Sequence, residues 1–232
     1  FAIASGGTLN KLAESSQTPQ FIFDYPSEPR MAIPYLLSPL LRIFSRLGFY
    51  ELPDDFSNIC DQAERVISAF YPEAASRNNP AKKSALALQG KFPIIYSSPN
   101  IRGLAMRFKN QINENAKKSA ACDFFPELNH NSIEAYSRPD CSLVILMLES
   151  KFSSERIALR ENITSEILDQ NAIKHERIKF DECGNTLMEH LVMMSFSDTV
   201  SYYLSILNQT DPTAVPNIKY LNNQLIKELL EG

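Results

Sequence analysis

Short apolar runs alternate with longer segments of helical periodicity along most of this chain. Near the start, the pattern predicts short buried strands at residues 2–5 and 21–23, with a helix near Leu9–Glu14 between them. Farther along, strands are expected at residues 93–96, 121–125, 142–148 and 174–180. Helices are expected at residues 81–88, 101–118, 155–170, 186–207 and 217–230. This alternation predicts an α/β fold in three layers, a parallel sheet flanked by helices on both faces.

Helical patterns fill the stretch between these two strand-containing parts. Apolar residues recur at helical spacing from Ile33 until Gly48 ends the pattern. A second helix is expected after Asp54, which is suited to be its N-cap, and Pro72 should stop it. Residues 72–80 are mostly polar and end in two asparagines before a proline, which favours a turn or linker.

Composition and charge exclude several classes of protein. With 44% hydrophobic and 22% charged residues, the 232-residue chain has the balance of a globular protein with a sizeable core. The formal net charge is 23 − 27 = −4 and the basic residues are scattered, so neither a nucleic acid nor a membrane is expected as a partner. No signal peptide or apolar run of spanning length occurs, and a cytoplasmic location is expected.

The cysteines give no sign of a metal site. They lie far apart, without the spacing of zinc ligands, and each is expected to pack as a small hydrophobe; they are Cys60, Cys122, Cys141 and Cys183. No other motif in the chain requires a metal.

Polar residues suited to chemistry follow two of the predicted strands. Glu114 lies late on the helix after the strand at 93–96, and His130 lies in the loop after the strand at 121–125. Ligands of open parallel sheets bind beyond the carboxyl ends of the strands. The local pattern alone favours plainer interpretations, namely a solvated carboxylate for Glu114 and a surface histidine for His130.

Several segments also carry a family resemblance. Residues 102–117 read RGLAMRFKNQINENAK, similar to an arginine-glycine helix ending in N-E-N-A-K, and residues 126–134 read PELNHNSIE, matching a P-E-x-x-H-N-x-I-E loop. Residues 5–7 and 27–30 look like the glycine turn and proline-arginine pair that close a first sugar isomerase domain, and residues 208–221 resemble a C-terminal helix-turn-helix. Together these segments resemble the bifunctional phosphoglucose/phosphomannose isomerase family over residues 2–48 and 93–230.

The resemblance implies a domain organisation. Residues 1–72 would be the C-terminal remnant of a first sugar isomerase (SIS) domain plus connecting helices, residues 73–92 a linker and helix, and residues 93–232 a second SIS domain. The turns that hold phosphate in the family's first domain would precede Phe1. A chain that opens inside a strand, without Met, is therefore expected to be N-terminally truncated.

The resemblance further implies an aldose–ketose isomerase of glycolysis and gluconeogenesis. It would interconvert glucose 6-phosphate or mannose 6-phosphate with fructose 6-phosphate through a cis-enediol, without a metal or organic cofactor. Glu114 would move the proton between C1 and C2, and Arg30 would stabilise the enediolate oxygens. His130 would assist ring opening from across a homodimer interface.

Two positions near the C-terminus depart from the family pattern. Val215 and Asn222 stand where the family has a threonine and, seven positions later, a catalytic lysine. Asn222 is thus a substrate-binding candidate, and Lys219, about one helical turn away, is the other. A neutral amide cannot replace an ammonium as proton donor, so the truncated chain could be inactive. The main alternative is a non-catalytic sugar-phosphate-binding or regulatory protein on the same fold, and a third is a structural interaction domain.

Overall fold

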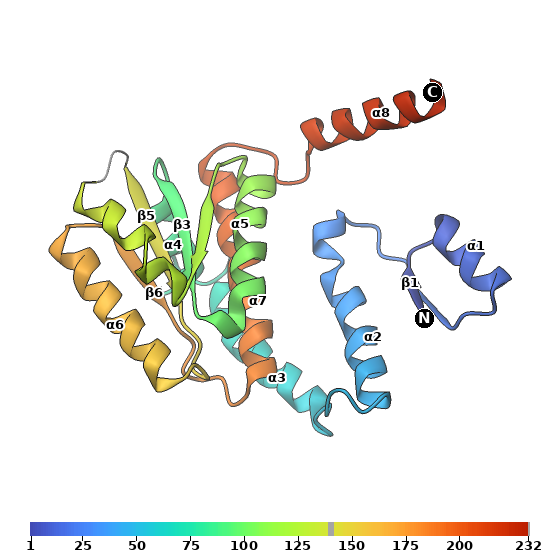
Figure 1. Ribbon diagram of the computed structural model, residues 1–232, viewed down its shortest axis with the longest axis horizontal. Helices are drawn as coiled ribbons and strands as arrows, with labels where there is room; N and C mark the ends of the chain where they lie inside the picture. The colour runs from blue at the N-terminus through green and yellow to red at the C-terminus, as the bar shows by residue number, and fades with distance from the viewer. Residues whose placement is uncertain (139–141, 232) are drawn as a thin grey trace. The chain divides into compact units, whose positions relative to one another are not determined.

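The chain forms two compact units, Phe1–Phe56 and Ser57–Gly232, in a computed structural model that describes residues 1–138 and 142–231. Each unit contains a parallel sheet flanked by helices, which confirms the expected α/β class (Figure 1). The boundary after Phe56 lies upstream of the predicted linker. The assignment of residues 1–72, 73–92 and 93–232 to a remnant, a linker and a second domain stays a prediction.

The smaller unit begins with a β–α–β arrangement. Strands β1 (Ala2–Ala4) and β2 (Gln20–Ile22) pair in parallel, and helix α1 (Gly7–Ser15) connects them. Gly6 and Gly7 have φ values of 145° and 78°, which only glycine adopts readily, so the chain can turn directly from β1 into α1. The expected burial of β2 is wrong, because Phe21 faces an open hollow beside the next helix and is 39% exposed.

A 3₁₀ turn and a long helix complete this unit. The turn η1 (Pro29–Met31) leads into α2 (Ile33–Arg46), and Gly48, with φ of 75°, follows the helix end as predicted. Tyr35 on α2 stacks against Tyr25, with 4.4 Å between the ring centroids. This contact holds the segment before η1 against the helix.

The larger unit is built on a four-stranded parallel sheet in the order β4-β3-β5-β6. The strands are β3 (Phe92–Ser97), β4 (Ala121–Phe124), β5 (Leu143–Leu148) and β6 (His175–Ile178). The helices are α3 (Phe56–Ile67), α4 (Pro80–Leu88), α5 (Arg102–Ala116), α6 (Glu155–Gln170), α7 (Thr186–Leu207) and α8 (Pro216–Glu231). Short 3₁₀ turns are η2 (Ser68–Phe70), η3 (Pro99–Ile101), η4 (Glu127–Asn129) and η5 (Ser132–Ser137). The elements lie close to the predicted ranges.

Two apolar clusters cover the two faces of this sheet. Alternate residues of β5 supply both, with Leu146 in the cluster beneath α3, α4, α5 and α7, and Met147 in the cluster beneath α6, η4 and η5. Figure 1 shows α5 and α7 on one side of the sheet and α6 on the other. The larger unit therefore has the expected three layers.

The strand order reverses at β3. From β3 the chain passes through α5 to β4 on one side, whereas β5, on the other side of β3, leads through α6 to β6. Right-handed crossovers that run in opposite directions place α5 and α6 on opposite faces. The carboxyl ends of β3 and β5 are neighbours at this switch point, where Ser97 pairs with Leu148.

The predicted linker is packed against the larger unit. Asn79 is fully buried, and its Nδ2 donates hydrogen bonds to the carbonyls of Phe70 and Tyr71 at 2.9 and 3.0 Å. Its Oδ1 accepts from the backbone N–H of Lys82 at 3.0 Å, which caps α4. Phe70 in turn packs against the Phe180 and Phe196 rings, so α3 and α4 belong to the core.

The cysteines behave partly as expected. Cys183 is buried, and this burial raises the pKa of its thiol to about 11. Cys60 and Cys122 are only half-buried, and Cys141 lies outside the described residues.

Asn79→Ala should destabilise the larger unit by about 2–3 kcal/mol, because it removes the α4 cap and two hydrogen bonds to the backbone. Its exposed neighbour provides the matched control, Asn78→Ala, which should cost no more than about 0.5 kcal/mol. Urea unfolding followed by circular dichroism measures both. Equal midpoints for the two variants would contradict the buried anchoring role of Asn79.

Candidate functional site

Glu114 lies half-buried in the last turn of α5. Its backbone is fixed by the asparagines on either side of it. Asn113 Nδ2 donates to the carbonyl of Lys118 at 2.7 Å, and Asn115 Nδ2 donates to Ser201 Oγ on α7 at 2.9 Å. The helix ends at Ala116, and the next residue, Lys117, has φ of 52° and donates from Nζ to the Glu114 carbonyl. The local fold thus holds one carboxylate at a rigid helix end.

His130 lies directly after η4 and is exposed. Its backbone N–H donates to the carbonyl of Glu127 at 2.8 Å. The loop is fixed by the fully buried side chain of Leu128 and by Asn129, whose Nδ2 donates to Thr164 Oγ1 of α6 at 2.8 Å. An exposed imidazole is thus carried on an anchored loop.

Glu114 and His130 are carried on opposite faces of the sheet of the larger unit. The α5 residues Phe108 and Ile112 pack into the cluster on one face. Leu128, two positions before His130, packs into the cluster on the other face. Within this chain, the sheet therefore lies between the helix that carries Glu114 and the loop that carries His130.

The other predicted site residues lie on η1 and α8. Arg30 belongs to η1 of the smaller unit and forms an ion pair with Glu28, with 3.7 Å between NH1 and Oε2. Lys219 and Asn222 are both exposed on α8. Because they are three positions apart on a helix, their side chains project from the same side of it.

A polar cluster at the switch point was missed by sequence analysis. Ser150, just after β5, donates from Oγ to Glu189 Oε2 at 2.6 Å, and the Lys151 N–H donates to Glu189 Oε1 at 2.7 Å. Glu189 is fully buried on the first turn of α7. The Glu189 carboxylate thus accepts hydrogen bonds from the donors at the carboxyl end of β5.

A second buried carboxylate lies beside it. Ser98, just after β3, donates from Oγ to Glu161 Oε1 at 2.5 Å and accepts from the Ser150 N–H at 3.0 Å. Burial raises the pKa of Glu161 to about 7; the hydrogen bond from Ser98 opposes this shift, and the charge of Glu149 adds to it. Glu149 is itself bound by Arg177 through two hydrogen bonds of 2.5 and 2.8 Å.

The sequence held one signal for this cluster, which is the serine pair after one predicted strand and the Glu-Ser-Lys triplet after another. Their proximity depends on β3 and β5 being neighbours, which strand prediction does not reveal. Glu161 and Glu189 lie on helices and gave no local sign of burial.

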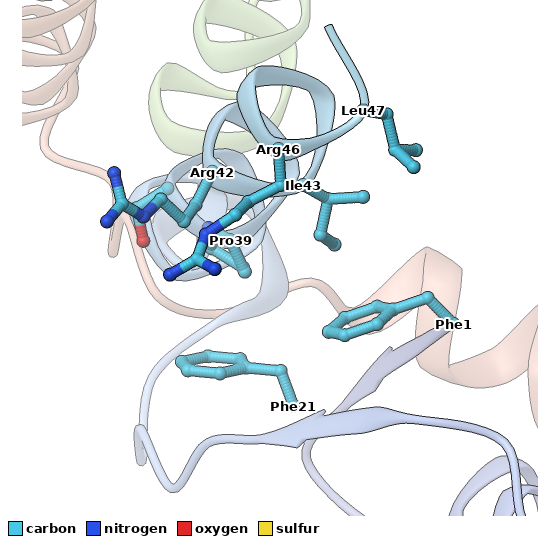
Figure 2. A pocket seen from close by; sticks show the side chains of 8 residues that line it. Phe1, Phe21, Pro39, Arg42, Ile43, Arg46 and Leu47 are labelled. Atoms are coloured by element: carbon cyan, nitrogen blue, oxygen red, sulfur yellow. The ribbon is translucent and has the colours of Figure 1, made fainter.

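Two hollows in the described part of the smaller unit are lined by residues other than the predicted site residues. The first, of about 480 Å³, is lined mainly by apolar side chains together with Arg42 and Arg46 of α2. Figure 2 shows the rings of Phe1 and Phe21 on one side of it and the two arginines on α2. A second, of about 380 Å³, lies between α2 and the residues before α3.

Across the described ranges, no group of three His, Cys, Asp or Glu side chains is placed to hold a metal ion. Among the helices that the structure describes, none combines the length and apolar character needed to cross a bilayer.

Comparison with known proteins gives consistent results. Residues 77–225 match the family model described as bacterial phospho-glucose isomerase C-terminal SIS domain. A bifunctional phosphoglucose/phosphomannose isomerase of Caldicellulosiruptor bescii is 33% identical over an alignment 232 residues long, gaps included. The alignment covers 97% of this chain and 67% of that protein. A D-glucosamine-6-phosphate 4-epimerase of Sulfolobus acidocaldarius is 34% identical over 137 residues, 58% of this chain and 41% of that protein.

A solved structure supports the fold. The glucose-6-phosphate isomerase like protein of Thermus thermophilus superposes with a TM-score of 0.65 at 19% sequence identity, over 95% of this chain and 76% of that one. At this identity, the likeness concerns the fold alone. It agrees with the three-layer arrangement described above.

Glu161→Gln should change how the stability of the protein depends on pH. In the folded state the pKa of Glu161 is raised from 4.5 to about 7, so protonated Glu161 contributes to the free energy of unfolding. This contribution is fully present below pH 4.5 and is lost as the pH rises through 7. By linkage, this loss amounts to at most about 3 kcal/mol, and the glutamine variant lacks it.

Urea unfolding at about pH 5 and about pH 8 tests this expectation. The variant should gain stability relative to the wild type at the higher pH. Glu166→Gln, an exposed change on the same helix, is the control and should follow the wild type. If the free energies of unfolding of Glu161→Gln and the wild type differed by the same amount at both pH values, this would contradict the raised pKa of Glu161.

Proposed function

Because the chain belongs to the family of bacterial phosphoglucose isomerase C-terminal SIS domains, we propose that it is an aldose–ketose isomerase of hexose 6-phosphates. Its substrates are glucose 6-phosphate or mannose 6-phosphate on the aldose side and fructose 6-phosphate on the ketose side. The observation that carries the proposal is the family match over residues 77–225, which includes the Glu114 helix and the His130 loop, both held in place by hydrogen bonds.

Glu114 is the base in this mechanism. Its carboxylate removes the proton from C2 of the open-chain aldose, the C2–H electron pair forms the C1=C2 bond of a cis-enediol, and the carbonyl oxygen at C1 takes up a proton. Glu114 then returns the proton to C1, and the C2 hydroxyl becomes the carbonyl by releasing its proton to solvent, which balances the proton taken up at O1. The reaction is an internal redox exchange between C1 and C2, so it needs neither a metal nor an organic cofactor.

Arg30 stabilises the negative charge that develops on the enediolate oxygens. A guanidinium remains charged at every working pH and presents two parallel N–H groups, which suits the two neighbouring oxygens of a cis-enediolate.

His130 assists ring opening and comes from a second subunit. The sheet lies between the Glu114 helix and the His130 loop within one chain, which favours a homodimer in which each subunit completes the other's site. Exposure of the imidazole and anchoring of its loop fit a residue that reaches into a partner subunit.

The helix α8 contributes to substrate binding in this proposal. Asn222 supplies an amide that can hydrogen-bond sugar hydroxyls, and Lys219, on the same side of the helix, supplies an ammonium that can attract the phosphate. The reaction takes place in the cytoplasm and serves glycolysis and gluconeogenesis.

Glu114→Gln should lower turnover of fructose 6-phosphate to glucose 6-phosphate on the order of 10²–10⁴-fold, since an amide cannot accept the proton. Affinity for fructose 6-phosphate should change little, because the substitution keeps the size of the side chain. Turnover is measured by a coupled assay and affinity by calorimetry, in the protein that carries this sequence. Glu166→Gln, on the exposed side of α6, is the control for loss of one negative charge.

The same experiment separates the rival functions. If the Glu114→Gln variant kept both its affinity for the sugar phosphate and its function in the cell, a binding or regulatory protein would be favoured. Inversion at C4 of glucosamine 6-phosphate by the wild type, without isomerisation of fructose 6-phosphate, would instead assign the activity named for the Sulfolobus relative.

Mixing two inactive variants should restore activity if His130 acts across a dimer interface. In a mixed dimer of Glu114→Gln and His130→Ala subunits, one of the two sites has both residues intact. Random reassociation should therefore recover about one quarter of wild-type turnover. The outcome against the proposal is a mixture that stays as inactive as its components although mass spectrometry detects mixed dimers.

A further inference from the structure

The flank of α5 carries a second cluster of polar side chains, distinct from the residues proposed for catalysis. It surrounds a hollow of about 480 Å³ lined by Lys109, Asn113, Lys117, Lys118, Ser119, Ala120 and Asn217. This volume lies within the usual range for small-molecule sites. All of the lining side chains belong to the larger unit.

Helical spacing explains why these residues meet. Lys109 and Asn113 are four positions apart and so lie on the same side of α5, and Lys117 is the left-handed residue that directly follows the helix. Glu114 lies one position beyond Asn113 and does not line the hollow. This side of α5 faces the turn at Lys118 and Ser119, which connects α5 to β4.

The hollow has a strong excess of positive charge. Three of its lining residues are lysines, and none is a carboxylate. Lys117 donates to the Glu114 carbonyl and so neutralises part of the negative end of α5. Lys109 and Lys118, both half-buried, form no ion pair with any carboxylate in the described part of the chain.

Neutral donors complete the cluster. Ser119 offers a hydroxyl, and Asn217 lies in the first turn of α8, where free backbone N–H groups make the helix end electropositive. Ammonium, hydroxyl and amide donors around one open hollow match the needs of a compact dianion with several acceptor oxygens.

We propose that this hollow is a binding site for the phosphate group of a small phosphorylated metabolite, separate from the catalytic residues. Lys109 and Lys118 provide the charge that selects a dianion. Asn113 keeps the turn in place, because its Nδ2 donates to the Lys118 carbonyl at 2.7 Å. The site is thus built on the same helix end that holds Glu114. Phosphate bound in the hollow can therefore influence the catalytic site at Glu114, and substrate bound there can influence the hollow.

Equilibrium dialysis with radiolabelled inorganic phosphate tests the proposal at constant ionic strength. The double variant Lys109→Gln/Lys118→Gln should weaken phosphate binding on the order of tenfold or more, since it removes two ammonium charges, of which that of Lys109 is bound, among the described residues, only by the neutral Asn110 amide at 3.3 Å. The control Lys11→Gln/Lys83→Gln removes the same charge from exposed positions on α1 and α4 and should bind as the wild type does. Lys109→Arg/Lys118→Arg keeps the charge and should retain binding.

Competing ligands distinguish what is recognised. Fructose 6-phosphate should displace phosphate from the wild type if a phosphate ester is accepted, and failure to displace it would assign the site to free phosphate. Chloride at the same ionic strength should not displace phosphate. Absence of saturable phosphate binding, or equal affinity in the two double variants, would overturn the proposal. Because the dialysis involves no turnover, its result tests the phosphate site independently of the proposed function of Glu114.

Discussion

The arrangement of the larger unit depends on the reversal of strand order at β3. A right-handed crossover through α5 runs to one side of this strand, while β5 and the crossover through α6 lie on the other side. The two crossover helices must then cover opposite faces of the sheet. The reversal fixes the separation of the Glu114 helix from the His130 loop, and it brings the carboxyl ends of β3 and β5 together.

The second consequence of the reversal is a crevice that the protein fills with its own carboxylates. Glu161 and Glu189 accept hydrogen bonds from Ser98, Ser150 and the following backbone N–H, so these buried acids are satisfied. In other open parallel sheets such donors face a ligand. Ligand chemistry in the larger unit is therefore expected along α5 and the loop after β4, where polar groups remain open to solvent.

Local sequence predicted most of the elements and the motif-bearing segments, because helix and strand periodicity depends on near neighbours. The range of α7 agrees with the prediction, and Glu114 and His130 lie on the helix and loop expected for them. Properties set by distant contacts were not predictable. Asn79 looks like a turn residue in sequence but is buried against η2, and Glu161 acquires its raised pKa only where β3, β5 and α6 meet.

In the proposed enediol mechanism, this chain contributes the carboxylate that transfers the proton, Glu114. Incubation of the protein with fructose 6-phosphate in deuterated water, followed by nuclear magnetic resonance, tests it most directly. Deuterium should appear at C1 of the ketose and at C2 of the aldose, at a rate that depends on Glu114. Isomerisation without any incorporation, or incorporation that is unchanged in a Glu114 variant, would contradict it.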